Sequence, residues 1–382
     1  MKHHIRLIAA GGIAVSAAML LGGTSRAATQ GPAHWRAERG TGAVFAQTDS
    51  AGGNAIVVYD RAADGTLTQA GVYATGGAGG ILSGSVVDHL ASQDSLVYDR
   101  ARGLLYAVNA GSNTVTVFSV DGPRLIRRQV TGSGGTFPVS VAVHGDLVYV
   151  LNARDGGSVQ GFVLAGGRLV RIPAWHRTLG LNPAQTPEFL STPGDIAFTP
   201  DGSELLVTTK TNQSVIDVYR IGPLGAPSAE PAVNADPGNA PFGISFDAGG
   251  HAVIAEAGPN ALAAFTPHRD GTLALLGRLD TGQQATCWVI RDGSTFFVSN
   301  AGSADVSRVS DDGSGTLLPL GTTPTDKGTV DAATSPDGQY LYVQTGAAGI
   351  VDEYRVGPGG LLNRIGSVTV PDAVGGEGIA AS

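Results

Sequence analysis

Residues 195–220 read DIAFTPDGSELLVTTKTNQSVIDVYR. The segment holds three short runs rich in β-branched and aromatic residues, separated by a Pro-Asp-Gly turn at 200–202 and a polar loop at 210–214. Such runs between turn residues predict the strands of an antiparallel meander and not helices. Nearly the same pattern returns at 330–356 as VDAATSPDGQYLYVQTGAAGIVDEYRV, and a segment that repeats at this scale indicates a structural unit.

The residues that end the second strand of each repeat define the period of the chain. Their successive spacings are 61, 43, 57, 47, 44 and 45 residues. A period in the mid-forties with four strands per repeat is typical of a β-propeller. The sequence therefore predicts an all-β fold of seven blades, each with four antiparallel strands, and almost no helix. The aligned residues are Thr48, Asn109, Asn152, Thr209, Glu256, Asn300 and Thr345.

The first repeat lacks an innermost strand, and the C-terminus supplies a candidate. The final EGIAAS matches the inner-strand position of DIAFT at 195–199. We therefore expect residues 378–382 to pair with the first blade and close the ring, which removes the open edges of a linear array. The propeller is then predicted to span residues 43–382, after a flexible segment at 28–42.

The N-terminus has the layout of a secretory signal peptide. Lys2 and Arg6 precede an apolar run at 7–21, and small residues follow up to Ala27. The run is too short and too rich in glycine to be a good membrane span. We expect residues 1–27 to be removed and the mature protein to be secreted or extracytoplasmic, with no membrane anchor.

Charge and cysteine content exclude several classes of partner and site. The chain carries 24 Lys and Arg against 32 Asp and Glu, and this acidity argues against nucleic acid and against a phosphorylated substrate. The single cysteine, Cys287, excludes an intramolecular disulfide, and its apolar surroundings favour a buried structural role. No calcium loop, zinc-ligand spacing or dinucleotide fingerprint occurs, so we expect no cofactor and no side-chain metal site. A channel cation held by backbone carbonyls stays open, and we expect a monomer.

In a propeller, the loops between blades emerge on the same face as the loops that join second and third strands, around the channel mouth. We call this the mouth face, and the side with the Pro-Asp-Gly hairpin turns the far face. Two long insertions, at 76–95 and 176–195, are predicted on the mouth face, with His89 and His176 in or beside them. Loops of this length in a compact repeat are typically functional lids or mobile surface.

Charged residues from neighbouring repeats are expected to meet at this mouth. A carboxylate that activates water beside a cation that holds an oxyanion is what the opening of a cyclic ester requires. A polar rim whose charges pair with each other is the alternative, and the three asparagines also fit plain turn residues. The predicted catalytic residues are Glu256, Asp195 and His176, and the predicted substrate-binding residues are Arg154, Lys210, Glu188, Asn109, Asn152 and Asn300.

Repeats such as LLYAVNAGSNTVTVF (104–118), TPDGSELLVTTKTNQSVIDVY (199–219) and FFVSNAGSADVSRVSDDGSGTL (296–317) resemble the seven-bladed propeller lactonase family. That family includes 6-phosphogluconolactonases and muconate-type lactonising enzymes, and the resemblance covers essentially residues 43–382. The repeats also resemble surface proteins built around a Tyr-Val-Thr-Asn core. The lactonase resemblance implies a propeller that acts on a small lactone or a carbohydrate-like ligand.

The sequence departs from the family pattern at the expected active site. Family members carry Gly-Pro-Arg-His at the start of an inner strand, whereas residues 192–195 have Gly in the Arg position and Asp in the His position. Residues 239–243 lack both, and Ala255-Glu256 keeps only the Glu of a family Asn-Glu pair. The resemblance thus implies one family carboxylate, Glu256. His176, Arg154 or Lys210 would substitute for the missing family His and Arg.

Two functions from different classes follow. The first is an exported lactonase-like hydrolase, with Glu256 or Asp195 as general base and Arg154 or Lys210 polarising the carbonyl. Its substrate is expected to be a lactone other than a cytosolic sugar phosphate. The alternative is a non-catalytic extracellular propeller that binds a sugar, peptide or protein partner on its mouth face.

Overall fold

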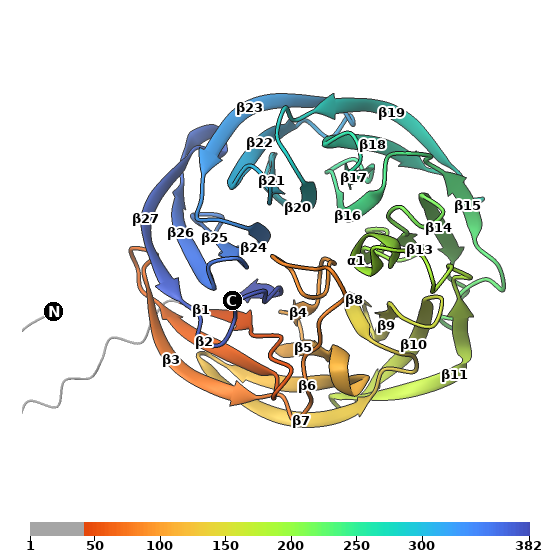
Figure 1. Cartoon of the computed structure of the whole chain (residues 1–382), viewed down its shortest axis with the longest axis horizontal. Coiled ribbons are helices and arrows are strands. Elements are labelled where there is room, and N and C mark those ends of the chain that lie inside the picture. Colours follow the sequence, from red (N-terminus) through yellow and green to blue (C-terminus); the bar gives the residue numbers. More distant parts are fainter. Residues whose placement is uncertain (1–41) are drawn as a thin grey trace, which may run out of the picture. The chain divides into compact units, whose positions relative to one another are not determined.

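The computed structural model describes residues 42–382, so the predicted signal peptide and almost all of the flexible segment lie outside the described residues. Seven four-stranded antiparallel sheets surround a central channel as blades (Figure 1). This confirms the predicted all-β, seven-bladed propeller. In the described part of the chain, helix is limited to the single turn α1 (Glu188–Ser191) and two short 3-10 segments. None of these helices is long and apolar enough to cross a membrane.

Each blade runs from an innermost strand at the channel to an outermost strand at the rim (Figure 1). The innermost strands, in blade order one to seven, are β28 (Ile379–Ala381), β4 (Leu96–Asp99), β8 (Pro138–His144), β12 (Ile196–Phe198), β16 (Pro241–Phe246), β20 (Thr286–Asp292) and β24 (Thr329–Thr334). The second strands are β1 (Gly42–Gln47), β5 (Leu104–Asn109), β9 (Leu147–Asn152), β13 (Glu204–Thr208), β17 (Ala252–Glu256), β21 (Thr295–Asn300) and β25 (Tyr340–Thr345). The third strands are β2 (Ala55–Arg61), β6 (Thr114–Asp121), β10 (Ser158–Ala165), β14 (Val215–Arg220), β18 (Ala261–Pro267), β22 (Asp305–Asp311) and β26 (Ile350–Val356). The outermost strands are β3 (Leu67–Ala74), β7 (Arg124–Gly132), β11 (Arg168–Thr178), β15 (Ala232–Ala235), β19 (Leu273–Asp280), β23 (Leu317–Pro324) and β27 (Leu362–Thr369).

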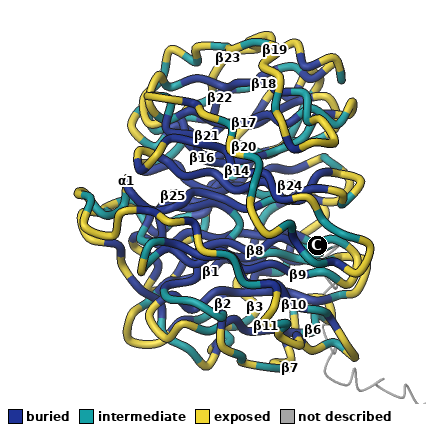
Figure 2. Tube along the Cα trace, turned by 90° about the vertical axis from the view of Figure 1, so that its right-hand side faces the viewer, coloured by how far each residue is buried: buried dark blue, intermediate teal, exposed yellow. Residues whose placement is uncertain are grey.

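Burial along the strands explains why these sequences form blades. Second strands such as β13 and β25 are buried at every residue, because both of their faces pack against neighbouring blades. Outermost strands such as β27 alternate between buried or half-buried and exposed residues, as expected for a sheet edge with one covered face. Figure 2 shows the same division, with buried strands and exposed turns, and α1 projecting from the ring.

The C-terminal residues close the ring as predicted. Strand β28 pairs antiparallel with β1, and the register places Ile379 opposite Ala46 and Ala381 opposite Val44. Gly378 accepts a backbone hydrogen bond from Gln47 at 2.9 Å, just before the paired region. The first blade is therefore built from both ends of the described chain.

The first insertion runs into the channel and bonds to inner strands on several sides of it. It joins β3 to β4, and its residues 92–95, which we call the plug, lie in the middle of the ring (Figure 1). The Gln93 side chain donates to the backbone oxygen of Ile244 in blade five and accepts from the amide of Val289 in blade six. The amide of Val141 in blade three donates to the backbone of the plug. The plug thus ties inner strands from across the ring to one another.

One glycine is required for this arrangement. A Cβ placed on Gly243 in β16 would lie 2.2 Å from Oε1 of Gln93 and 2.8 Å from the backbone oxygen of Cys287. The missing side chain lets the plug amide approach the inner strand closely. Any larger residue at this position must displace the plug.

Candidate functional site

Both insertions emerge on the mouth face and contact each other. The second one begins after β11 and contains α1, so His176, predicted in or beside it, instead belongs to the outermost strand of blade three. Arg154 forms an ion pair with Glu188 of α1 at 2.7 Å, and Glu188 also accepts from the amide of Ser83 in the first insertion at 2.6 Å. These contacts fasten the two insertions over the mouth.

A cavity of about 340 Å³ lies beneath these insertions, beside the plug. Its walls are mainly apolar and include Val86 of the first insertion, Phe189 of the second, and Phe242 and Trp288 at the inner strands of blades five and six. Small residues such as Ala301, in the loops that follow the second strands, line another side of the cavity. We call this space the mouth cavity.

Lys210 lines the mouth cavity from the loop after β13 and is only 1 % exposed. Its Nζ donates to the backbone oxygen of Ala91 at 2.5 Å and to Oγ1 of Thr192 at 2.9 Å. The ammonium also lies 5.2 Å from the ring centre of Phe242. Burial lowers the pKa of Lys210 to about 7, although the charge of Asp88 opposes the shift. The amine is therefore poised between its charged and neutral forms near neutral pH.

Asp88 is the second buried ionisable group on the cavity wall. Its two carboxylate oxygens accept from the amides of Leu90 at 2.8 Å and Ser92 at 2.9 Å, so the tight turn of the insertion holds the side chain in place. Burial raises the pKa of Asp88 to about 6, opposed by these amides and by Lys210. Sequence reasoning considered His89 and passed over Asp88, which follows Val86 and Val87 in the same loop.

Cys287 also lines the cavity, and burial raises the pKa of its thiol to about 12. A thiol with so high a pKa stays protonated at neutral pH and is a poor nucleophile. This agrees with the structural role expected from the sequence. Its neighbour Trp288 donates from Nε1 to the backbone oxygen of Ser92, which joins the cavity wall to the plug.

Asp195 lies at the channel end of β12 and is fully buried. It accepts from Oγ of Ser140 at 2.9 Å and from the amide of Ile244 at 2.9 Å. Burial, together with the negative charge of Asp94, raises its pKa well above the ordinary value. Asp195 is not among the residues that line the mouth cavity. Its contacts join inner strands of three blades.

Glu256 is buried at the end of β17 and turned toward the rim of its own blade. Its carboxylate accepts from Nε of Arg278 in β19 at 2.7 Å, and the same guanidinium contacts Asp236 at 2.7 Å. Burial raises the pKa of Glu256 to about 7, against the opposing effect of Arg278. The structure therefore pairs Glu256 with an arginine, and Glu256 is not among the residues that line the mouth cavity with Lys210.

The remaining predicted residues are also apart from the cavity. His176 pairs with Gln160 in blade three, at the outer edge of the ring. The asparagines Asn109, Asn152 and Asn300 are fully buried, and Asn300 bonds to Asp305 and Ser307 within its own hairpin. These contacts match the turn interpretation of that repeat position.

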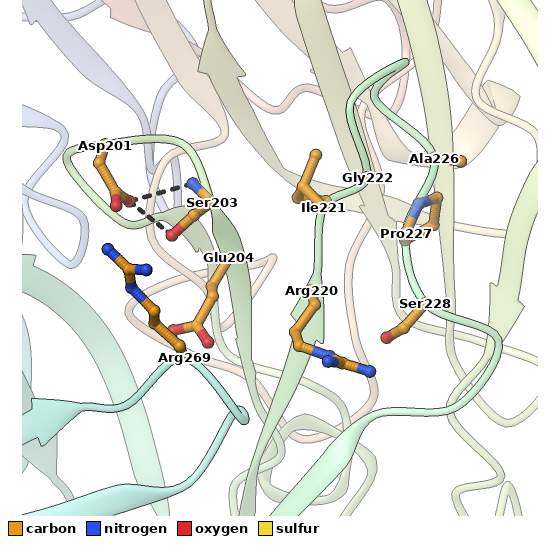
Figure 3. Close-up of a pocket in the computed structure, with 10 residues that line it drawn as sticks. All are labelled: Asp201, Ser203, Glu204, Arg220, Ile221, Gly222, Ala226, Pro227, Ser228 and Arg269. Atoms are coloured by element: carbon orange, nitrogen blue, oxygen red, sulfur yellow. Dashed lines mark hydrogen bonds between the residues drawn. The ribbon is translucent and has the colours of Figure 1, made fainter.

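A larger groove of about 570 Å³ lies on the far face, between the hairpin turns of blades four and five (Figure 3). Asp201 there bonds to Ser203 in the Pro-Asp-Gly turn, which lowers the pKa of that carboxyl. Glu204 is buried, but the two arginines of the groove, Arg220 and Arg269, are exposed. The groove is open and its two arginines are solvated, so the smaller and more apolar mouth cavity is the better candidate site.

Buried carboxyls near the plug predict an unusual dependence of stability on pH. Burial raises the pKa of Asp49 to about 8, and it raises those of Asp331 and Glu377 well above their usual range. A carboxyl whose pKa is higher when folded binds more protons in the folded state, so stability falls as pH rises. We expect the free energy of unfolding in denaturant titrations to be larger at pH 5.5 than at pH 8. Lys210 acts in the opposite direction, but chiefly above pH 7.

The matched variant is Glu377→Gln, which keeps the size of the side chain and removes its titration. It should reduce the slope of stability against pH between these limits. Carboxyls whose pKa is lowered, such as Glu188, change stability only below the pKa of the unfolded chain. A wild-type stability that is flat, or that rises from pH 5.5 to pH 8, would contradict this assignment.

Among the described residues, no group of three or more His, Cys, Asp or Glu side chains is placed to hold a metal ion. Within residues 42–382, the polar side-chain groups that line the mouth cavity are hydroxyls, the amine of Lys210, the carboxylate of Asp88, the thiol of Cys287 and the indole N–H of Trp288. What this set can do chemically is to position a small neutral molecule between a proton acceptor and a cation.

Comparison with known proteins agrees with the seven-bladed propeller fold. A family described as "Lactonase, 7-bladed beta-propeller" matches residues 78–375. The periplasmic gluconolactonase of Pseudomonas aeruginosa is similar in structure, with 18% identity, a TM-score of 0.74, and coverage of 89% of this chain and 98% of that one. A candidate 6-phosphogluconolactonase of Bacteroides fragilis has 19% identity and a TM-score of 0.69, with coverage of 89% and 98%. At these identities the two structures support the fold alone, and no curated protein matches the sequence.

Proposed function

Because the chain belongs to the seven-bladed β-propeller lactonase family, we propose that it is an exported hydrolase that opens a small lactone ring in the mouth cavity. One observation carries the proposal: a single apolar cavity is lined by both a buried lysine, Lys210, and a buried aspartate, Asp88. Buried ionisable groups of opposite charge type in one pocket are a common feature of catalytic sites. Export rests on the predicted signal peptide at residues 1–27.

In the proposed reaction, ionised Asp88 takes a proton from a water molecule as the water oxygen bonds to the lactone carbonyl carbon. The Lys210 ammonium stabilises the oxyanion that forms on the carbonyl oxygen. The ring carbon–oxygen bond then breaks, and the leaving oxygen takes the proton from Asp88. The product is a hydroxy acid, which releases one proton to solvent at neutral pH.

This assignment keeps one predicted role and replaces another. Lys210 retains the role of the cation that polarises the carbonyl. Glu256 and Asp195, the predicted bases, do not line the cavity, so the base is assigned to Asp88. Arg154 is engaged with Glu188 and is assigned to fastening the insertions.

The rate should follow a bell-shaped dependence on pH. Activity requires ionised Asp88 and protonated Lys210, whose pKa values are about 6 and about 7. Activity rises as Asp88 loses its proton and falls as Lys210 loses its proton, so kcat/KM is expected to be highest between those two values. Initial rates from pH 4.5 to pH 9, corrected for spontaneous hydrolysis, measure this profile. A rate that keeps rising above pH 8 would contradict the role given to Lys210.

The direct test is acid release from a panel of γ- and δ-lactones, followed at constant pH. Purified wild type should release acid faster than the buffer, and Asp88→Asn should lose most of that rate and the acidic limb of the profile. Lys327→Met, a change of an exposed lysine in the loop before β24, is the matched surface control. If no lactone is opened faster than in buffer, the hydrolase proposal fails and the non-catalytic binding propeller takes its place.

A further inference from the structure

The walls of the mouth cavity point to the kind of lactone that fits. Apolar side chains from both insertions, such as Val86 and Leu190, face apolar residues of blades five and six, such as Phe242 and Trp288. Among the described residues, 42–382, no arginine lines the cavity. A phosphorylated or carboxylated substituent would therefore have only Lys210 to oppose its charge.

Most polar side chains of the lining are already engaged within the protein. The hydroxyl of Ser85 donates to the backbone oxygen of Asp88, and that of Thr211 donates to the backbone oxygen of Leu190 at 2.7 Å. Trp288 donates to the plug. The hydroxyls of a sugar lactone would lose their water contacts here and gain few protein partners, and burying such groups unpaired is costly.

The two ionisable groups of the cavity are more deeply buried than the large apolar side chains that the insertions contribute. Asp88 and Lys210 are buried beside the plug, whereas Val86 and Leu190 are exposed at the outer end. A lactone ring next to the two ionisable groups thus leaves its substituent to run outward between apolar walls. With a volume of about 340 Å³, the cavity is at the small end of ligand pockets.

We propose that the substrate is a γ- or δ-lactone carrying an unbranched alkyl or an aryl substituent, and not a sugar lactone. The inference rests on the proposed function and specifies its substrate class. The lactone ring is held beside Asp88 and Lys210, and the substituent provides affinity by leaving water for the apolar walls.

The first test compares kcat/KM for γ-lactones whose alkyl chain grows from methyl to octyl with kcat/KM for glucono-δ-lactone. Each buried methylene should raise kcat/KM about three- to fourfold until the cavity is filled. The best alkyl lactone should exceed glucono-δ-lactone by on the order of 100-fold. Equal or better use of glucono-δ-lactone would overturn the substrate assignment while leaving the hydrolase proposal intact.

A cavity-filling variant tests where the chain lies. Ala301→Leu adds a branched side chain to the wall, so it should lower kcat/KM for octyl lactone about tenfold or more and spare the methyl lactone. Ala248→Leu, on the far face and exposed, is the matched control and should change neither. If Ala301→Leu leaves the ratio of octyl to methyl unchanged, the chain does not occupy the cavity.

A binding measurement separates this inference from catalysis. Alkyl γ-lactams are stable amide analogues, and their titration should change the fluorescence of Trp288 with an affinity that grows with chain length. The change should be lost in Trp288→Phe. If the wild type turns over no lactone, chain-dependent lactam binding still supports an apolar ligand site, whereas its absence overturns the inference.

Discussion

Deletion of Gly378–Ser382 is expected to remove most of the folding free energy of the propeller. These residues contain β28, the innermost strand of a blade whose other strands come from the opposite end of the described chain. Without them, the backbone of β1 loses its partner along the edge that faces the channel. The first blade then ends in an open edge beside an acidic, partly filled channel.

The expected loss is comparable to the whole stability of a domain. Ile379 is only 4 % exposed, and its burial contributes about 2 kcal/mol. The hydrogen bonds to β1 contribute about 1 kcal/mol each, and they extend from Gln47 to the amide of Ala43, which donates to Ser382. Folded domains have a free energy of unfolding of only about 5–15 kcal/mol. Losing these contributions together therefore removes most of that free energy.

Thermal unfolding and size-exclusion chromatography measure the effect. The deletion should give aggregated material, or a melting temperature lowered by well over 10 °C, estimated from the energies above. Ser382→Ala keeps the strand and removes the two hydrogen bonds between the Ser382 hydroxyl and the backbone of Ala43, so it should shift melting only slightly. A deletion variant that melts like the wild type would show that the ring does not depend on this strand.

Lys210→Met should abolish most turnover while the fold survives. If the ammonium holds the oxyanion, its removal should lower kcat/KM by about 10²- to 10³-fold. Methionine is apolar and of similar length, and it relieves the penalty for burying a charge, which partly offsets the two lost hydrogen bonds. Activity and stability should therefore respond very differently to this change.

The measurement is kcat/KM by acid release, together with denaturant unfolding of the same sample. Lys210→Arg keeps a positive charge and should shift the alkaline limb of the pH profile upward, with partial activity. Lys327→Met should behave like the wild type in both assays. Full activity of Lys210→Met would remove Lys210 from the mechanism. A loss of activity that is explained by the fraction of unfolded protein would indicate a structural role only.

The architecture was readable from the sequence because each repeat ends its second strand at a recognisable loop. Strands β5, β9, β17, β21 and β25 end at the residues aligned beforehand, and β1 and β13 end one residue before them. The first insertion was also bounded closely, since β3 ends at Ala74 and β4 begins at Leu96. These features depend on local turn chemistry and period, which a sequence displays directly.

The site was harder because side-chain direction and tertiary path decide it. Glu256 was correctly placed at a strand end, but its partner Arg278 lies on an outer strand that the loop alignment did not consider. Arg154 and Glu188 were expected to contact a substrate on the mouth face. In the structure they form an ion pair with each other. Asp88 was missed because nothing local shows that its loop crosses the channel.

The plug, described above as a tie between inner strands, follows directly on Ala91, which lines the mouth cavity. We expect the plug to close the ring axis, so that molecules arrive and depart by the same side. A hydroxy acid formed next to Lys210 has to back out before the next lactone enters. Its new carboxylate would linger near the ammonium, so accumulated product should compete with substrate, and progress curves should slow well before the substrate is used up.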